Sequence, residues 1–262
     1  MNRLYVVGMG PGNPDHMSRR AFDVIDQADV LAGYTTYMDL IKDLTHGKKI
    51  IATAMKKEVD RIQAAVDTAI SGSSCAVISS GDPGIYAMAG LVCEICRQRD
   101  IPIVKPGCYP VPDNAICLEI VPGIPALASG AALLGAPLTH DFACISLSDL
   151  LTPWDLIEKR IDCAARADFV IVIFNPKSRK RNWQLNKAQE IILKYRKPET
   201  PVGIVRNAMR DKQEVTIVPL KDLHLADVDM VTTVFVGSSA SEQYLDFMYT
   251  PRGYRDKYGL TG

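Results

Sequence analysis

Short apolar runs alternate with amphipathic stretches along the N-terminal part of the chain, up to about residue 98. Four runs have the length and composition of buried strands and cover residues 4–8, 29–34, 48–53 and 74–81. Apolar residues recur with a helical period over residues 17–28, 57–70 and 84–98. Strands that alternate with helices are typical of βαβ units, so the pattern predicts a mostly parallel sheet covered by helices.

A proline-rich stretch interrupts this pattern at residues 100–125. It contains six prolines and two glycines, with one short apolar run at 115–121, and therefore predicts loops and a domain boundary. We expect an N-terminal α/β domain over residues 1–115 and a C-terminal α/β domain over residues 116–262.

The second half of the chain is richer in strands. Helices are predicted over residues 125–135, 153–167 and 181–196, and strands over residues 142–148, 168–175, 201–207, 213–219 and 230–237. Several of these strands are joined by short connections, which favours antiparallel pairing and hence a mixed sheet.

Composition narrows the classes of function. Thirty basic side chains balance thirty acidic ones, so no overall field attracts nucleic acid or an anionic membrane, and we expect neither partner. No apolar leader opens the chain and no apolar run approaches the length of a membrane span, which favours a cytoplasmic location. The seven cysteines are expected to be reduced thiols, with Cys93 and Cys96 as two helix residues rather than a metal or redox site.

A glycine-rich loop, "VVGMGPGNPDHMS", follows the first predicted strand and suggests a phosphate cradle. The third glycine of a dinucleotide-binding fingerprint would have to fall at Asn13, and no Gly-Lys-Ser/Thr follows as in a P-loop. Pro11 and Pro14 also remove two backbone N–H donors. Phosphate binding is therefore not expected, and the loop is either a plain turn or a place where a large flat ligand or a neighbouring segment approaches closely.

Two further loops of small residues follow later strands. Residues 79–84, "SSGDPG", lie at the carboxyl end of a strand, where open α/β sheets bind ligands. Asp82 there either binds hydroxyl or amino groups of a ligand or caps the next helix. Residues 122–135 combine prolines with a helix poor in large side chains, which leaves room for a ligand or for a closely packed neighbour.

The resemblance of the chain to a known family rests on three segments: "VVGMGPGNPDHMS", "SSGDPGIYAMAG" and "VPGIPALASGAALLGAPL". Together they resemble the tetrapyrrole (corrin/porphyrin) methylases, from Tyr5 to Tyr258. The segments "GAPLTHDFACISLSDLLTPWDLIEKRI", "ADFVIVIFNPKSRKR", "GIVRNAMR" and "MYTPRGYRDKYG" look like the branch that methylates ring carbon C(17) of precorrin-3B or cobalt-factor III.

This resemblance implies a fold and an activity. The fold would be two α/β domains, mostly parallel in the first and mixed in the second, with an active-site trough between them, in a homodimer. S-adenosylmethionine would donate the methyl group to the tetrapyrrole. After methylation the macrocycle would contract and extrude its C(20) carbon as an acyl group, giving precorrin-4 or cobalt-precorrin-4.

Matched position by position, the resemblance also implies contacts to S-adenosylmethionine from Pro11, Ser80, Gly81, Asp82, Ile85, Pro125, Ala126, Phe174, Asn175 and Ala208. Pro125 and Ala126 stand where the family usually has a Thr/Ser-Ala pair, so only backbone contact is implied there. Gly10 and Gly12 would line the tetrapyrrole side of the trough. The proline-rich stretch over residues 102–113 is longer than the usual connection, and the resemblance does not define its role.

The chemistry of the implied reaction selects further candidates. Methyl transfer from a sulfonium needs alignment in a water-poor site and no metal. Ring contraction needs a group that takes a proton from an oxygen at C(20) and donors for developing carbonyl oxygens. His140 and Asp141 are the acid/base candidates, because histidine titrates near neutrality and an adjacent acid can orient it. A purely structural role for His140 is the alternative.

Cationic and polar side chains suit the many carboxylates of a tetrapyrrole. The expected substrate contacts in the second domain are Ser148, Arg206 and Arg252. Further candidates are Lys177, Arg179, Lys180 and Arg181, although ordinary surface charge is favoured for at least two of these four. Asp149 either contacts the macrocycle or, like Thr152, caps the helix that begins near Trp154.

Three other functions stay open at this point. The chain could methylate another position or substrate of the same family, or bind the cofactor without turnover, which the departure at Pro125 motivates. A nucleotide-dependent oxidoreductase is a third class. The sequence does not distinguish a metal-free from a cobalt-bearing substrate.

Overall fold

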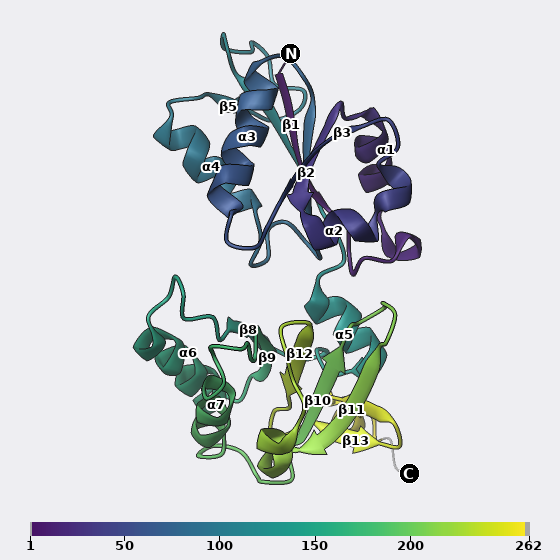
Figure 1. Ribbon diagram of the computed structural model, residues 1–262. Helices are drawn as coiled ribbons and strands as arrows, with labels where there is room; N and C mark the ends of the chain where they lie inside the picture. Colours follow the sequence, from purple (N-terminus) through teal and green to yellow (C-terminus); the bar gives the residue numbers. More distant parts are fainter. Residues whose placement is uncertain (1, 260–262) are drawn as a thin grey trace. The chain divides into compact units, whose positions relative to one another are not determined.

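The computed structural model describes residues 2–259 and divides the chain into two compact units, residues 1–125 and 126–262 (Figure 1). The division follows Pro125 rather than residue 115, where we expected it. The physical reason is strand β6 (Ile116–Val121), which pairs in parallel with β1 (Asn2–Gly8) along its whole length and so belongs to the first sheet.

The first unit is built on a six-stranded sheet in which every pair of neighbours is parallel, in the order β3-β2-β4-β1-β6-β5. This confirms the parallel α/β fold predicted from the alternating pattern. The remaining strands are β2 (Val30–Tyr34), β3 (Lys49–Thr53), β4 (Cys75–Ser79) and β5 (Ile103–Val104). The helices are α1 (Arg19–Gln27), α2 (Thr35–Leu40), α3 (Glu58–Ile70) and α4 (Ala89–Gln98), with short 3-10 helices at Pro14–His16 and Lys42–Leu44.

Strand β1 lies in the interior of this sheet, and its side chains alternate between two cores. Leu4 and Val6 pack with α3 and α4 on one face, whereas Tyr5 and Val7 pack with α1 on the other. Because both faces of the sheet are covered, these residues of β1 are apolar on either face, and they form a continuous apolar run in the sequence. Helix α4 begins five residues later than predicted, at Ala89, after a turn in which Tyr86 has a positive φ of 52°.

The second unit holds a five-stranded sheet that is mixed, as predicted, with the strand order β11-β10-β12-β9-β8. Its strands are β8 (Phe142–Ser146), β9 (Val170–Phe174), β10 (Pro201–Arg206), β11 (Glu214–Pro219) and β12 (Thr232–Val236). Strands β8 and β9 are parallel, and the other neighbouring pairs are antiparallel. Helices α6 (Trp154–Arg166) and α7 (Gln184–Ile192) cover one face, and α5 (Ala126–Leu134) packs on the other.

A small three-stranded sheet completes the second unit. It consists of β13 (Glu242–Tyr244), β14 (Phe247–Tyr249) and β7 (Gly135–Ala136), and is followed by a short helix, α8 (Tyr254–Tyr258). A 3-10 helix spans Leu220–Leu225. Over the described part of the chain, no helix combines the length and apolar character needed to cross a membrane.

Candidate functional site

Three small-residue loops meet at the carboxyl edge of the first sheet. The loops follow β1, β4 and β6, which are neighbours in the sheet. Gly10 and Gly81 exchange two backbone hydrogen bonds, with N to O distances of 3.2 and 2.7 Å, and the Met9 N–H donates to the Ser79 carbonyl at 2.9 Å. The connections after β1 and β4 leave toward opposite sides of the sheet. This is the topological switch point at which open α/β sheets bind ligands.

Glycine is required in these loops because the backbones approach one another closely. A Cβ at Gly123 would lie 2.2 Å from the Gly81 carbonyl oxygen, and a Cβ at Gly8 would lie 2.6 Å from the same atom. Gly10 and Gly81 also have positive φ angles of 65° and 66°. The sequence left open whether these loops are plain turns or places of close approach. At Gly8 and Gly123 a neighbouring backbone segment approaches closely.

The carboxylate of Asp82 joins two of the loops. Its Oδ1 accepts from the N–H of Gly84 at 2.8 Å, and its Oδ2 accepts from the N–H of Gly123 at 3.2 Å. Because α4 begins only at Ala89, Asp82 is not the cap of that helix. A carboxylate has about four acceptor positions, and these two bonds leave acceptor capacity for a ligand.

A groove of about 320 Å³ borders the same loops. It is lined by Asp15, His16, Met17, Ser18, Pro122, Gly123 and Ile124. His16 ends a 3-10 helix that is capped by the Asn13 side chain, which accepts from the Asp15 N–H at 3.0 Å. The groove therefore lies beside Gly10, whose added Cβ would meet the His16 carbonyl oxygen at 2.8 Å.

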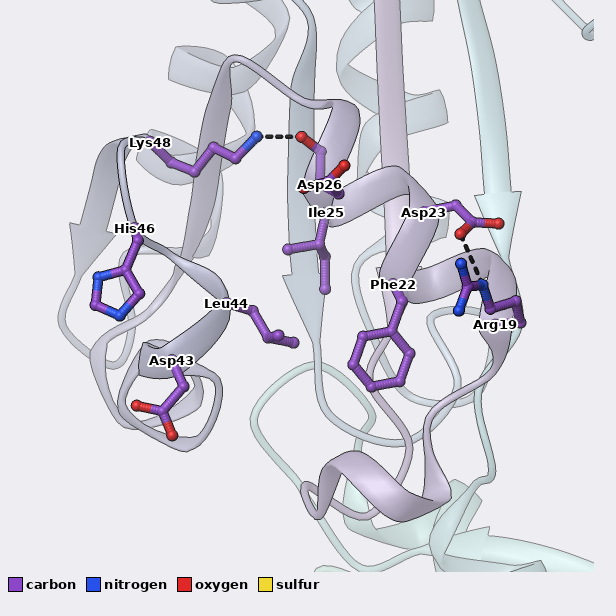
Figure 2. A pocket seen from close by; sticks show the side chains of 9 residues that line it. All are labelled: Arg19, Phe22, Asp23, Ile25, Asp26, Asp43, Leu44, His46 and Lys48. Atoms are coloured by element: carbon purple, nitrogen blue, oxygen red, sulfur yellow. Dashed lines mark hydrogen bonds and ion pairs between the residues drawn. The ribbon is translucent and has the colours of Figure 1, made fainter.

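A second groove in the first unit, of about 440 Å³, lies between α1 and the segment 43–48 (Figure 2). Its lining includes Phe22, Asp26, His46 and Lys48, and the Lys48 ammonium donates to the Asp26 carbonyl. None of the site residues predicted from the sequence lines it. We therefore place the candidate site of this unit at the three loops.

The second unit gathers its predicted residues at one edge of its own sheet. Strands β8, β9 and β10 run in the same direction, so Ser148, Asn175 and Arg206 all lie at or just beyond their carboxyl ends. The Asn175 amide donates to the Ser146 hydroxyl oxygen at 3.0 Å, and that oxygen also accepts from the Ser148 N–H at 3.1 Å. Asn175 adopts a positive φ of 51°, which asparagine tolerates better than most residues.

Arg181 is a residue of this edge whose position the sequence did not reveal. Its side chain is buried and donates to the Asn175 carbonyl at 3.0 Å. Burial lowers the pKa of the guanidinium, and the negative charge of Asp149 opposes this shift. Gln184, the first residue of α7, donates to Asp149 at 2.9 Å, so the loop after β8 is linked to the start of α7. Arg179 and Lys180, by contrast, are exposed, as favoured for at least two of the four cations.

The start of α6 tests the expectation that Asp149 or Thr152 caps this helix. Residue Pro153 precedes the helix, and no side chain caps its first N–H groups. Asp149 bonds to Gln184 instead, so neither Asp149 nor Thr152 is the helix cap.

Arg206 lies among three carboxylates. Its guanidinium is 2.7 Å from Asp229, 3.3 Å from Asp227 and 3.8 Å from Glu214. The following loop is strained, with positive φ values of 50° at Asn207 and 56° at Met209. The carboxylates hold the start of the loop that carries Ala208, and they compete with any carboxylate of a substrate for the same guanidinium.

Phe174 and Ala208 both lie against a small core on the α5 face of the sheet. This core also explains the small residues of α5. A Cβ at Gly130 would lie 2.6 Å from the Phe235 ring, so the helix packs closely on β12 at that position. Ala126 is the first residue of α5, and Pro125 directly precedes it.

The acid/base candidates lie elsewhere in the second unit. His140 and Asp141 precede β8, whereas Ser148 follows it, and the five residues of the strand span roughly 16 Å. The two residues are therefore not beside Ser148, Asn175 and Arg206. They lie instead near the segment that leads to Arg252, since the Thr139 hydroxyl donates to the Thr250 carbonyl at 2.6 Å.

The hydrogen bonds of His140 define its tautomer. Its Nδ1 accepts from the Asp141 backbone N–H at 2.8 Å, so the neutral ring carries its proton on Nε2. The Asp141 carboxylate lies 3.8 Å from Nδ1, and both side chains are largely exposed. In this arrangement His140 presents a donor and Asp141 presents an acceptor.

Metal ligation is a separate question. Among the side chains that the structure describes, no three of His, Cys, Asp or Glu lie close enough together to hold a metal ion.

Comparison with known proteins identifies the class to which this fold and these loops belong. The family model of the tetrapyrrole (corrin/porphyrin) methylases matches residues 3–224, and the chain belongs to this family. The crystal structure of the methyltransferase CobJ is similar, with a TM-score of 0.86 and 33% identity over 96% of this chain and all of that chain. A uroporphyrin-III C-methyltransferase of Thermus thermophilus, solved with S-adenosyl homocysteine, shares the fold, with a TM-score of 0.67 and 21% identity over 90% of this chain and 97% of that one.

Several proteins with similar sequences have names that specify a substrate. A cobalt-factor III methyltransferase of Priestia megaterium is 49% identical over 98% of this chain, which spans only 46% of that longer protein. A probable cobalt-factor III C(17)-methyltransferase of Salmonella typhimurium is 42% identical over 96% of this chain and 99% of its own length. A precorrin-3B C(17)-methyltransferase of a Sinorhizobium species is 37% identical over 96% of both chains.

Proposed function

We propose that this protein transfers a methyl group from S-adenosylmethionine to C(17) of cobalt-factor III or precorrin-3B, with contraction of the macrocycle to cobalt-precorrin-4 or precorrin-4. The observation that carries the proposal is the near end-to-end match to the Salmonella relative of that activity, at 42% identity. Two relatives named for cobalt-factor III are 49% and 42% identical to this chain, whereas a relative named for precorrin-3B and a further one named for cobalt-factor III are each 37% identical. The cobalt-bearing substrate is therefore the favoured one.

The loops of the first unit suit S-adenosylmethionine, which supplies an activated methyl group on a sulfonium. Asp82 offers a carboxylate held rigidly by two backbone N–H groups, with acceptor capacity left for ribose hydroxyls. Ser80, Gly81 and Ile85 flank it and would contact the methionine and ribose parts. Pro11, Pro125, Ala126, Phe174, Asn175 and Ala208 complete the proposed set. Alignment of the sulfonium with the accepting carbon is the main requirement for displacement at the methyl carbon.

For ring contraction we assign different roles to the two acid/base candidates. The Nε2–H of His140 donates to a developing carbonyl oxygen of the macrocycle, because Nδ1 already accepts from the Asp141 N–H. On a substrate that carries a hydroxyl group at C(20), the Asp141 carboxylate takes the proton of that hydroxyl. Gly10, Gly12, Ser148, Arg206 and Arg252 are the proposed substrate contacts. Arg206 acts only to the extent that Asp227, Asp229 and Glu214 leave a donor available.

We also propose a cellular location and an oligomeric state for the protein. Like other enzymes of small-molecule biosynthesis, the protein would act in the cytoplasm, without a nucleic-acid or membrane partner and as a homodimer. Sedimentation analysis of the purified protein tests the last point, since a dimer has twice the mass of the 28.7 kDa chain.

The experiment that tests the proposal is a parallel incubation with S-adenosylmethionine and either cobalt-factor III or precorrin-3B. The visible spectrum and mass of each product report methylation and ring contraction. We expect a ring-contracted product from cobalt-factor III. Cofactor binding without turnover on either substrate would favour a binding protein instead, and a methylated but uncontracted product would favour a different methylase of the family.

A further inference from the structure

Thr250 lies between two segments that each carry a proposed substrate-contacting residue. It follows β14 and precedes Arg252 by two residues, while the neighbouring segment 136–139 leads directly into His140. The residue is 2% exposed. The hydrogen bonds of this buried residue therefore hold the two segments relative to each other.

Every polar group of Thr250 is hydrogen-bonded, and three of the four bonds go to the segment before His140. The backbone N–H donates to the Ala136 carbonyl at 3.1 Å, and the hydroxyl donates to the Pro137 carbonyl at 2.7 Å. The backbone carbonyl accepts from the Thr139 hydroxyl at 2.6 Å. A buried residue bonded in this way holds its neighbours in one arrangement, because each unmade bond would leave a desolvated polar group.

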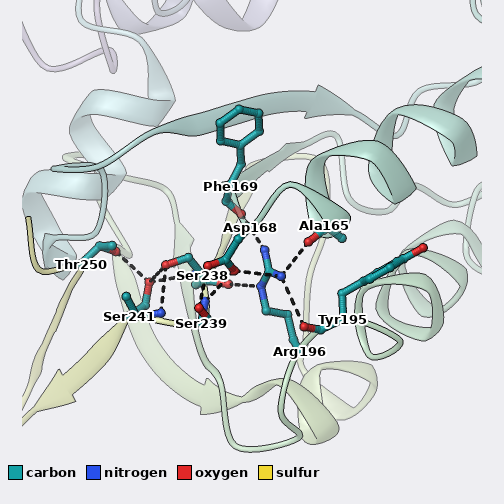
Figure 3. Close-up of polar contacts among 11 residues, drawn as sticks. Ala165, Asp168, Phe169, Tyr195, Arg196, Ser238, Ser239, Ser241 and Thr250 are labelled. Carbon is teal, nitrogen blue, oxygen red and sulfur yellow. Dashed lines mark hydrogen bonds and ion pairs between the residues drawn. The ribbon is translucent and has the colours of Figure 1, made fainter.

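The fourth bond anchors Thr250 to the interior of the unit (Figure 3). The Ser241 hydroxyl lies 2.7 Å from the Thr250 hydroxyl oxygen and, since that hydroxyl donates to Pro137, Ser241 is the donor. The Ser241 oxygen in turn accepts from the Ser238 N–H at 2.8 Å. A line of buried hydroxyl groups thus connects the interior of the unit to the segments that carry His140 and Arg252.

We propose that Thr250 is a positioning residue that fixes the His140 segment against the Arg252 segment, so that both side chains act on one region of the tetrapyrrole. The inference rests on the proposed function. Arg252 would bind a peripheral carboxylate of the macrocycle, and His140 would donate to an oxygen close to that carboxylate. Both side chains are exposed and would otherwise sample many directions, so the buried clamp supplies the alignment that catalysis needs.

The test compares Thr250→Val, which keeps the shape and removes both hydroxyl bonds, with Thr250→Ser, which keeps the hydroxyl. Ser239→Ala is the matched control, because its hydroxyl bonds to Asp168 at 2.6 Å in the same region and does not touch Thr250 (Figure 3). We expect Thr250→Val to raise the KM for cobalt-factor III about tenfold, with the Kd for S-adenosylmethionine within about twofold of wild type. Thr250→Ser and Ser239→Ala should stay close to wild type in both quantities.

A second readout does not depend on turnover. The ring resonances of His140, assigned by comparison with His140→Gln, should move in Thr250→Val and stay in place in Thr250→Ser and Ser239→Ala. If Thr250→Val does not fold, Thr139→Val removes the bond to the Thr250 carbonyl from an exposed residue and should move the same resonances. The inference is overturned if the His140 resonances are unchanged in folded Thr250→Val. It is also overturned if the affinity of that variant for S-adenosylmethionine falls as much as its affinity for cobalt-factor III. If wild type methylates no tetrapyrrole, the proposed function fails, and the resonances alone decide the positioning role.

Discussion

The carboxylate of Asp82 accepts a 3.2 Å hydrogen bond from the backbone N–H of Gly123, a residue 41 positions later in the chain. The same carboxylate accepts from Gly84 at 2.8 Å. One side chain thus fixes the loop after β4 against the loop after β6, and it does so where we propose that the cofactor binds. This arrangement makes the cofactor site sensitive to changes at either loop.

Replacing Asp82 with Asn should weaken cofactor binding. The amide nitrogen is a donor and would face one of the two backbone N–H groups, so one loop contact and one ribose acceptor are lost together. We expect the Kd for S-adenosylmethionine to rise at least about tenfold, measured by calorimetry. Asp60→Asn removes only an exposed ion pair with Lys57 and should leave that Kd unchanged. Equal affinities of the two variants would remove Asp82 from the cofactor site.

Replacing Gly123 with Ala should destabilise the first unit. The new Cβ would lie 2.2 Å from a backbone oxygen that cannot move without breaking the Gly10–Gly81 bridge. We expect a loss of roughly 3 kcal/mol in the free energy of unfolding in urea. Gly90→Ala is the matched change, since it lies in α4 with nothing within 4 Å of its added Cβ, and it should stabilise by about 0.5–1 kcal/mol. Similar small effects at both positions would contradict the close approach of the loops.

The thiol of Cys75 should make stability depend on pH in the alkaline range. Burial raises the pKa of this thiol to about 12. The folded state therefore holds the proton where the unfolded chain releases it, and stability is present below the unfolded pKa of roughly 8.5 and is lost as pH rises toward 12. The free energy of unfolding should fall by about 1.4 kcal/mol per pH unit more in wild type than in Cys75→Ala between pH 9 and 11.

Urea titrations of both proteins at several pH values measure this difference. Parallel curves for the two proteins would show that Cys75 ionises equally in both states. As an independent check, the exposed thiols of Cys93, Cys108 and Cys163 should react with a thiol reagent in the native protein, while Cys75 should react only after unfolding.

The tautomer of His140 predicts a graded effect on ring contraction. His140→Gln retains a donor near the position of Nε2, whereas His140→Ala removes it. We expect His140→Ala to lower the rate of ring contraction about 100-fold, and His140→Gln to lower it less than about tenfold, with methyl transfer retained in both. The ratio of contracted to uncontracted methylated product, separated by chromatography, measures this. An equally large loss in both variants would mean that His140 acts as a base.

The fold of the first unit could be predicted from the sequence because its strands are buried on both faces and read as apolar runs. The domain boundary was placed too early, since β6 follows a proline-rich loop and its partner β1 lies about a hundred residues away in sequence. A pairing of that range leaves no local signal. The six residues of α2 are likewise too few for a recognisable helical period.

The sequence predicted which loops form the candidate site, but not the hydrogen bonds and ion pairs that hold its side chains. Sequence order gave no sign that Arg181 turns inward to the Asn175 carbonyl, or that three later carboxylates surround Arg206. Thr250 was missed for the same reason, because its partners lie more than a hundred residues earlier. Such roles depend on tertiary contacts, which a single sequence does not contain.

The proposed activity specifies the ring carbon that receives the methyl group. Incubation of the wild-type protein with cobalt-factor III and S-adenosylmethionine labelled with 13C in its methyl group, followed by NMR of the isolated product, locates the label directly. We expect one labelled methyl group on C(17) of a ring-contracted macrocycle. A label on any other ring carbon, or a labelled product that keeps C(20) in the ring, would contradict it.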